Sequence, residues 1–178
     1  MRPPVSDPLP ERPHAPGYEV PESSDGLLPF AWARQRLEDA ITWWVASVRP
    51  DGRPHVMPIW GAWVDDRAYL LGQLTARWAR NLAGNGACVV HIQAGEDVVI
   101  VEGEAVLLTD PSAELLERCR TGFGKYQASH GNAVAPEAWV GKGFWEVTPR
   151  VAFGFSDYVV DATRWRFHAP DEPADPGA

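Results

Sequence analysis

The sequence predicts a mainly β domain of the α+β class, an antiparallel β-barrel with flanking helices. Six or seven short segments are rich in Val, Ile, Trp and Tyr, and turn-forming residues separate them. Only two or three segments space their apolar residues as a helix does. With 178 residues, the chain is long enough for one domain with a substantial core.

The elements of the first half are separated by recognisable turns. The first turn between strands contains Pro50 and Gly52, and the second consists of Asp65 and Asp66. In order, we expect a helix at 29–39 and strands at 41–48, 55–64 and 68–73.

The second half begins with a short helix that starts at Thr75 and ends before Gly84. It continues with strands at 87–93 and 98–108, a helix at 113–120, a Gly-containing connection at 122–143, and strands at 144–148 and 151–158. The nearly unbroken apolar run Val98–Val101 is typical of a strand that is buried on both faces or lies at a dimer contact.

The two ends of the chain differ in composition from its middle. Eight of the 17 prolines precede Phe30 and three follow Ala169, and neither end has periodic apolar residues. We therefore expect residues 1–29 and 170–178 to be disordered or loosely draped, and residues 30–169 to form the folded domain.

Charge and composition exclude several classes of function. Residues 30–169 carry 14 Lys/Arg and 16 Asp/Glu, so most of the net charge of −8 lies at the ends and no basic nucleic-acid surface is indicated. No apolar run is long enough to span a membrane and no signal core is present, so we expect a cytoplasmic protein without membrane contact. Cys88 and Cys119 lie far apart and away from His at ligand spacing, which predicts reduced packing residues and no metal site.

The start of the short helix after the third strand is a candidate anion site. Thr75 is a suitable N-cap, and Arg77 and Arg80 lie three residues apart on one helical face. Helix N-termini offer unpaired N–H groups and a partial positive charge, and the arginine fork matches phosphate oxygens. The alternative is a surface helix with solvated arginines.

The sequence contains none of the common catalytic signatures. It has no phosphate-binding loop, nucleophile elbow, dinucleotide fingerprint or zinc-protease motif. The acid pairs and His55 and His91 are more easily explained as structural residues, so the catalytic residues are unknown and no proton donor is named. We therefore expect a bound cofactor to carry any chemistry.

An aromatic strand lies beside the anion site in the sequence. Trp60, Gly61 and Trp63 follow Pro58, which fits an edge or bulge, and Gly61 would let a flat ring approach the backbone closely. A planar heterocycle with a phosphate tail could lie along this strand. Alternatively, the nine Trp residues simply build a bulky core.

Four segments occur in an order and spacing that resemble a known family. They are Gly-Arg-Pro-His-Val-Met-Pro-Ile-Trp at 52–60, Trp-Val-Asp-Asp at 63–66, Thr-Ala-Arg-Trp-Ala-Arg-Asn-Leu at 75–82, and Val-Val-Ile-Val-Glu-Gly-Glu-Ala at 98–105. The pattern resembles the pyridoxamine 5′-phosphate oxidase-like split-barrel family of flavin and deazaflavin enzymes. The closing Ala-Thr-Arg-Trp-Arg-Phe at 162–167 is similar to the deazaflavin-dependent reductase branch, and the likeness spans roughly Leu37 to Phe167.

The resemblance implies a homodimer of six-stranded antiparallel split barrels, with coenzyme F420 or FMN bound at the interface. Residues that match the family's phosphate-binding region are Thr75, Arg77, Arg80 and Asn81, and those that match the ring-binding strand are Val56, Met57, Pro58 and Trp60; Lys125 and Trp165 lie at the fringe. Where relatives often have Ser-Arg-Lys, this chain has Ala-Arg-Trp-Ala-Arg at 76–80.

The activity implied by the resemblance is hydride transfer to a small unsaturated or aromatic substrate. Arg53 and Arg77 are candidates for binding the additional acidic tail of F420. The chain lacks the Arg and His pattern near the C-terminus that pyridoxal phosphate synthesis would need. Alternatives are a non-catalytic flavin-, deazaflavin- or haem-binding protein, with His55 or His91 on the iron, and a structural dimer with a vestigial cleft.

Overall fold

The predicted antiparallel barrel is confirmed. The computed structural model describes residues 7–131 and 134–167. Six strands close the barrel in the order β2-β3-β4-β7-β6-β5, and β8 and β1 extend the sheet beyond β7. The strands are β1 (Pro10–Glu11), β2 (Trp43–Val48), β3 (Pro54–Val64), β4 (Arg67–Leu71), β5 (Ala87–Ala94), β6 (Asp97–Leu107), β7 (Phe144–Phe155) and β8 (Thr163–Arg166).

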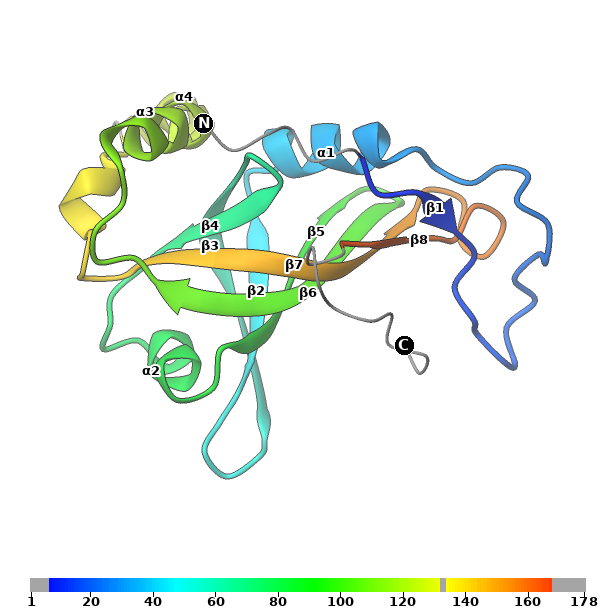
Figure 1. The fold of residues 1–178 in the computed structure, drawn as a ribbon, viewed down its shortest axis with the longest axis horizontal. Helices are drawn as coiled ribbons and strands as arrows, with labels where there is room; N and C mark the ends of the chain where they lie inside the picture. The colour runs from blue at the N-terminus through cyan, green and yellow to red at the C-terminus, as the bar shows by residue number, and fades with distance from the viewer. Residues whose placement is uncertain (1–6, 132–133, 168–178) are drawn as a thin grey trace.

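Helices lie at the barrel ends and on part of its outer face (Figure 1). They are α1 (Phe30–Asp39), α2 (Arg77–Gly84), α3 (Ala113–Phe123), α4 (Lys125–His130) and the short 3₁₀ helix η1 (Pro136–Trp139). Helix α1 inserts Phe30, Ala33 and Leu37 into the barrel core, where all three are buried. Within the described residues, no helix is both long and apolar enough to cross a membrane.

The apolar residues form two clusters on opposite sides of the sheet. The larger cluster fills the barrel and contains the fully buried Trp43 and Trp165. The smaller cluster lies between the outer face of β3 and β4 and the helices α3 and α4, with Tyr69, Phe123 and Tyr126 at its centre. Part of the outer face is therefore covered by helices.

The last strands differ from the sequence prediction. The two strands expected at 144–148 and 151–158 are one continuous strand, β7. Its pairing with β6 passes from Glu102↔Val151 to Gly103↔Pro149, so Arg150 is an extra residue that forms a bulge. A bulge tolerates Pro149, which has no N–H for the ladder, and the strand continues instead of ending.

The structure also contains elements that the sequence did not indicate. Strand β8 and helix α4 lack a clear apolar period because they are short and derive their burial from neighbouring elements. Residues 7–29, expected to be disordered or loosely draped, lie at the surface along a path in which β1 pairs with β8. Residues 1–6 and 170–178 lie outside the described residues.

Candidate functional site

Helix α2 packs beside the hairpin formed by β2 and β3, which projects beyond the rest of the barrel (Figure 1). The contact is polar at its centre: Asn81 Nδ2 donates to Ser47 Oγ at 3.0 Å, and both residues are 3% exposed. Ser47 pairs with His55 across the hairpin. Asn81 therefore fixes α2 to the inner side of this hairpin, and its amide faces the protein rather than solvent.

The expected anion-binding residues lie on the exposed side of the same helix. Thr75, Arg77 and Arg80 are all exposed, and neither arginine makes an ion pair with any described residue. The expectation that Thr75 caps the helix is wrong, because the helix starts at Arg77 and its N-cap is Ala76, which makes no side-chain bond. The amide of Ala76 instead closes a turn onto the carbonyl of Gln73, which places Thr75 before the cap. The two guanidinium groups are accessible to an external anion.

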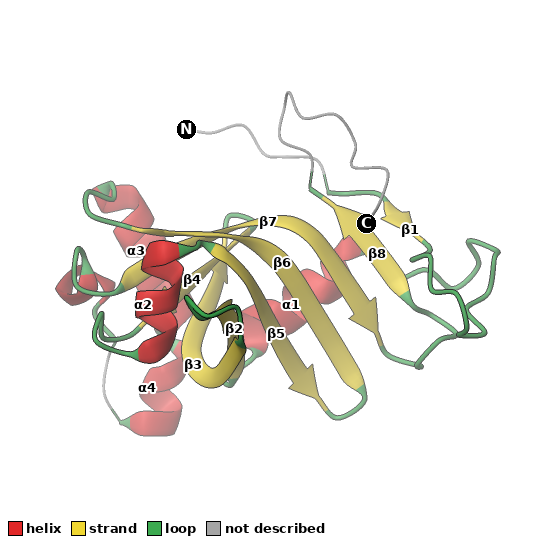
Figure 2. Cartoon of the chain, turned by 90° about the horizontal axis from the view of Figure 1, so that it is seen from below, coloured by secondary structure: helices red, strands yellow, loops and turns green. Residues whose placement is uncertain are grey.

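A further part of the outer barrel face is exposed, and we call it the outer sheet face. Strand alternation and register define two rows across β3, β2, β5, β6 and β7: Pro58, Trp44, His91, Ile100 and Phe153, and beside them Val56, Ala46, Val89, Glu102 and Val151, of which Val151 is buried. Val56 is 53% exposed and Trp44 is 36% exposed, which is unusual for large apolar side chains. Figure 2 shows β5 and β6 across this part of the barrel.

The four expected ring-binding residues divide between the two sides of β3. Val56 and Pro58 lie on the outer sheet face and are exposed. Met57 points inward and packs against the barrel core. Trp60 is half-buried and stacks on Tyr126 of α4, with ring centroids 5.1 Å apart. Of the four, only Val56 and Pro58 are therefore exposed to an external ligand.

Trp44 and His91 stack at the centre of the outer sheet face, with ring centroids 6.1 Å apart and planes 6° apart. Burial lowers the pKa of His91 from its ordinary value, which favours the neutral imidazole. Sequence reasoning did not single out Trp44. The alternation of side chains along β2 could have indicated this residue, because Trp43 is buried and its neighbour Trp44 must then point to the opposite face.

Lys125 lies at the edge of the helical cover and is held by the protein. Its Nζ donates to the carbonyl oxygen of Glu38 at 2.9 Å and lies 5.5 Å from the ring centroid of Trp43. Burial lowers the pKa of Lys125 to about 8, and the nearby Asp39 and Glu38 carboxylates oppose that shift. Lys125 thus links α4 to the end of α1, and its contacts are with α1 and the barrel core and not with Arg77 or Arg80.

Gly61 serves the core rather than a ligand. A Cβ at this position would lie 2.6 Å from Cδ2 of Trp43, inside the barrel. Tyr126 fixes the same residue from the other side, because its hydroxyl accepts from the Gly61 N–H and donates to the Gly61 carbonyl, both at 2.9 Å. The expected close approach of a flat ring at Gly61 is therefore wrong.

Other sequence candidates differ in exposure. Trp165 is fully buried in the barrel, whereas Arg53 is 71% exposed and pairs with Asp51 at 2.7 Å in the hairpin turn. Both cysteines are buried, and burial raises the pKa of each thiol to about 12. Among the described residues, no group of His, Cys, Asp and Glu is arranged to hold a metal ion.

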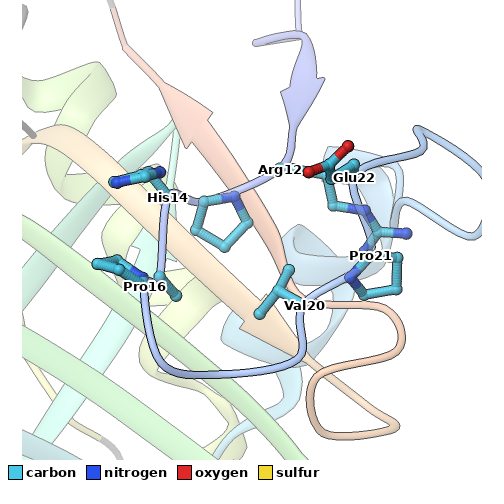
Figure 3. A pocket seen from close by; sticks show the side chains of 8 residues that line it. Arg12, His14, Pro16, Val20, Pro21 and Glu22 are labelled. Atoms are coloured by element: carbon cyan, nitrogen blue, oxygen red, sulfur yellow. The ribbon is translucent and has the colours of Figure 1, made fainter.

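A separate hollow lies in the N-terminal segment and not at α2 (Figure 3). It measures about 350 Å³ and is lined by Arg12, Pro13, His14, Ala15, Pro16, Val20, Pro21 and Glu22. Its walls come from one loop, so it is a feature of that loop and not of the barrel.

Comparisons with known proteins agree with this architecture. Residues 32–168 match the family model described as pyridoxamine 5′-phosphate oxidase. A search of curated proteins finds no match.

Solved structures share the fold at low identity. A conserved hypothetical protein from Mycobacterium tuberculosis is 20% identical with a TM-score of 0.61, over 77% of this chain and 90% of that one. An F420 reductase is 21% identical with a TM-score of 0.51, over 67% and 94%. A heme-binding protein from Mycobacterium smegmatis is 18% identical with a TM-score of 0.53, over 71% and 53%. On the evidence of the family model and the closed six-stranded barrel, the chain belongs to the pyridoxamine 5′-phosphate oxidase family.

Proposed function

We propose that this protein is an oxidoreductase that binds F420 or FMN and transfers a hydride to a small unsaturated or aromatic substrate. The observation that carries the proposal is the pair of exposed arginines, Arg77 and Arg80, on a helix that packs against β2 and β3, the two strands whose outer side carries exposed apolar residues. Such a combination fits a ligand with an anionic tail and a flat apolar ring. The F420 reductase among the structural neighbours supports the same class of function.

The residues present fit a phosphate-bearing cofactor. Arg77 and Arg80 have no ion-pair partner among the described residues, so they can bind phosphate oxygens without first breaking a contact. Asn81 holds α2 in place through Ser47 and is a positioning residue in this proposal. Val56 and Pro58 would contact the ring on the outer sheet face, beside Trp44.

The bound cofactor would supply the hydride, and the protein would supply position and exclusion of water. Trp60 stacks on Tyr126, and Lys125 bonds the same helix to the end of α1, so both residues hold α4 in place and are not assigned to the cofactor ring. No described side chain has the position and freedom to be assigned as proton donor, and solvent can serve that role.

We propose that a second copy of the chain packs against the outer sheet face. The two rows are apolar except for His91 and Glu102, and they run across five strands. Two-fold symmetric contacts are the commonest form of association and use the same patch on both copies. We expect wild-type protein to sediment with the mass of two chains. Trp44→Glu should give single chains, whereas Val160→Glu, at an exposed apolar residue outside this face, should not. A dimeric Trp44→Glu protein would refute this interface.

The direct test of the cofactor is a pair of binding titrations, with F420 and with FMN, on the purified full chain. Each ligand has a characteristic absorbance and fluorescence, so saturable binding is read without an activity assay. Micromolar binding of either cofactor supports the proposal, and the tighter ligand identifies the cofactor. Failure of both to bind at micromolar concentration contradicts it.

A variant tests the role of the arginines. Arg80→Ala removes a charge-assisted contact worth about 1.5–3 kcal/mol, so FMN binding should weaken roughly tenfold or more. Riboflavin lacks the phosphate and should bind both proteins equally. Arg118→Ala is the matched control, because Arg118 is also exposed but lies on α3, paired with Asp65 at 2.6 Å. Equal losses for FMN and riboflavin would mean that Arg80 does not contact the phosphate.

Haem binding is the second candidate, and His91 is the observation that favours it. Its imidazole lies on the outer sheet face, and burial favours the neutral form, which is the form that coordinates iron. His55 is less suitable because its Nε2 is buried. A Soret band after addition of haem, lost in His91→Ala, would favour this function over flavin binding.

A further inference from the structure

The edge of the sheet at β8 is covered by a short piece of the N-terminal segment. Strand β1 pairs antiparallel with β8 through Pro10↔Trp165 and Glu11↔Arg164 (Figure 1). Pro10 has no N–H, so of the two β1 residues only Glu11 can donate a backbone hydrogen bond. The backbone ladder alone therefore gives this strand little stability.

The side chain of Glu11 makes the strongest contact of this strand. One carboxylate oxygen, Oε1, accepts from Arg164 Nε at 2.8 Å and from Arg166 Nε at 2.7 Å. The arginine side chains are 10% and 19% exposed, and that of Glu11 is 41% exposed. Burial opposes ionisation of Glu11, but the hydrogen bonds from Arg166 and Arg164 outweigh it and lower the pKa of the carboxyl. This edge thus recognises a carboxylate on an extended chain.

The segment around β1 is held by polar contacts at the surface. None of the residues 7–29 is buried, although Thr163 and Trp165 beneath them are fully buried. Arg12 donates to the carbonyl oxygens of Ser23 and Ala162, at 2.7 and 3.0 Å. The contact with Ser23 is exposed and the contact with Ala162 is partly buried, and a segment held by a few such contacts without a buried residue of its own opens at a lower free energy than the barrel.

We propose that residues 7–13 are a displaceable strap over a docking edge on β8, and that the edge accepts an extended acidic segment of a partner protein. In the structure the strap occupies the position of that acidic segment, and Glu11 is its acidic residue. Strand addition to an open edge provides backbone hydrogen bonds, and Arg164 and Arg166 select the charge.

Charge argues against a second copy as the occupant of this edge. Antiparallel pairing of β8 with β8 of another copy would place Arg164 and Arg166 of one chain near those of the other, which is repulsive. An acidic strand meets the opposite charge, as Glu11 does. The edge is also separate from the arginines of α2, so this inference does not depend on the proposed cofactor.

The experiment uses the full chain and a labelled synthetic peptide, Asp-Pro-Leu-Pro-Glu-Arg-Pro, which copies residues 7–13. In wild-type protein the tethered strap competes at an effective concentration of about millimolar, so a micromolar peptide should bind poorly. In Glu11→Gln the strap is weakened, and the peptide should bind about tenfold more tightly or better, measured by fluorescence anisotropy. The same peptide with Gln in place of Glu should lose that gain.

Hydrogen exchange gives a second readout that needs no peptide. Those amides of residues 163–166 that point toward β1 rather than β7 should exchange about tenfold faster in Glu11→Gln than in wild type, because strap opening becomes more frequent. Glu19→Gln is the matched control, since Glu19 is an exposed acid of the same segment, and it should leave the exchange unchanged. Equal peptide affinity for wild type and Glu11→Gln, peptide binding to neither, or unchanged exchange at 163–166 would each overturn the proposal.

Discussion

The contact between Asn81 and Ser47 leads to a prediction that separates a structural role from a ligand-binding role. Both side chains are 3% exposed, and the amide of Asn81 donates to the Ser47 hydroxyl at 3.0 Å. Asn81→Ala leaves that hydroxyl buried without this partner, and Ser47→Ala leaves the amide in the same position. Replacing both residues removes the unsatisfied groups together.

The magnitudes follow from the burial of the two groups. A buried polar group that loses its partner costs about 1–3 kcal/mol, so each single variant should lower the free energy of unfolding by that amount. The double variant should cost less than the sum of the two, with a coupling of about 1 kcal/mol. Arg80→Ala, one residue away and exposed, should change stability by no more than about 0.5 kcal/mol.

The assay is denaturant unfolding of the four proteins at one protein concentration, followed by FMN and riboflavin titrations of those that fold. If Asn81 only positions α2, Asn81→Ala should weaken FMN binding less than Arg80→Ala does. Strict additivity of the two single variants would refute the reasoning, because it would mean that the two side chains do not act together. A large loss of FMN binding without loss of stability would instead make Asn81 a ligand-binding residue.

Two further predictions concern the packing of β3 and α4. Gly61→Ala should destabilise the protein by about 1–3 kcal/mol because its Cβ meets Trp43, whereas Gly84→Ala, with no atom within 4 Å, should be neutral or slightly stabilising in the same unfolding assay. The pKa of Lys125 is lowered from 10.5 to about 8, so between these values the unfolded chain binds more protons than the native one. Stability should therefore rise with pH across that window, and Lys125→Met should flatten the rise in unfolding measured from pH 7.5 to 10.5; an unchanged slope would contradict the assigned burial.

Much of the barrel was predictable because its strands are marked by local runs of apolar residues and end at recognisable turn residues. The helix at 29–39 and the strands ending at Val48 and Val64 have the bounds that periodicity and turn residues indicated, to within two residues. The turn at Asp65 and Asp66 has positive φ at both residues, 51° and 56°, as a two-residue hairpin turn requires. Each of these features depends on residues that are neighbours in the chain.

The candidate site was only partly predictable, because side-chain direction depends on partners that are distant in the sequence. Arg77 and Arg80 were expected beside an apolar strand and are exposed next to one. Asn81, from the same motif, turns inward because Ser47 of another strand accepts its amide. Gly61 and Trp60 were expected at a ligand, but Trp43 and Tyr126 contact them instead.

The sequence by itself determined the strand and helix pattern, the near neutrality of the domain and the family motif around Thr75–Leu82. These follow from the period of apolar residues, from composition and from local spacing. Only the tertiary structure decided which face of each strand is exposed, that Pro149 lies within one continuous strand, and that Glu11 meets Arg164 and Arg166. Those outcomes depend on register and on contacts between residues up to 155 positions apart, which no local pattern encodes.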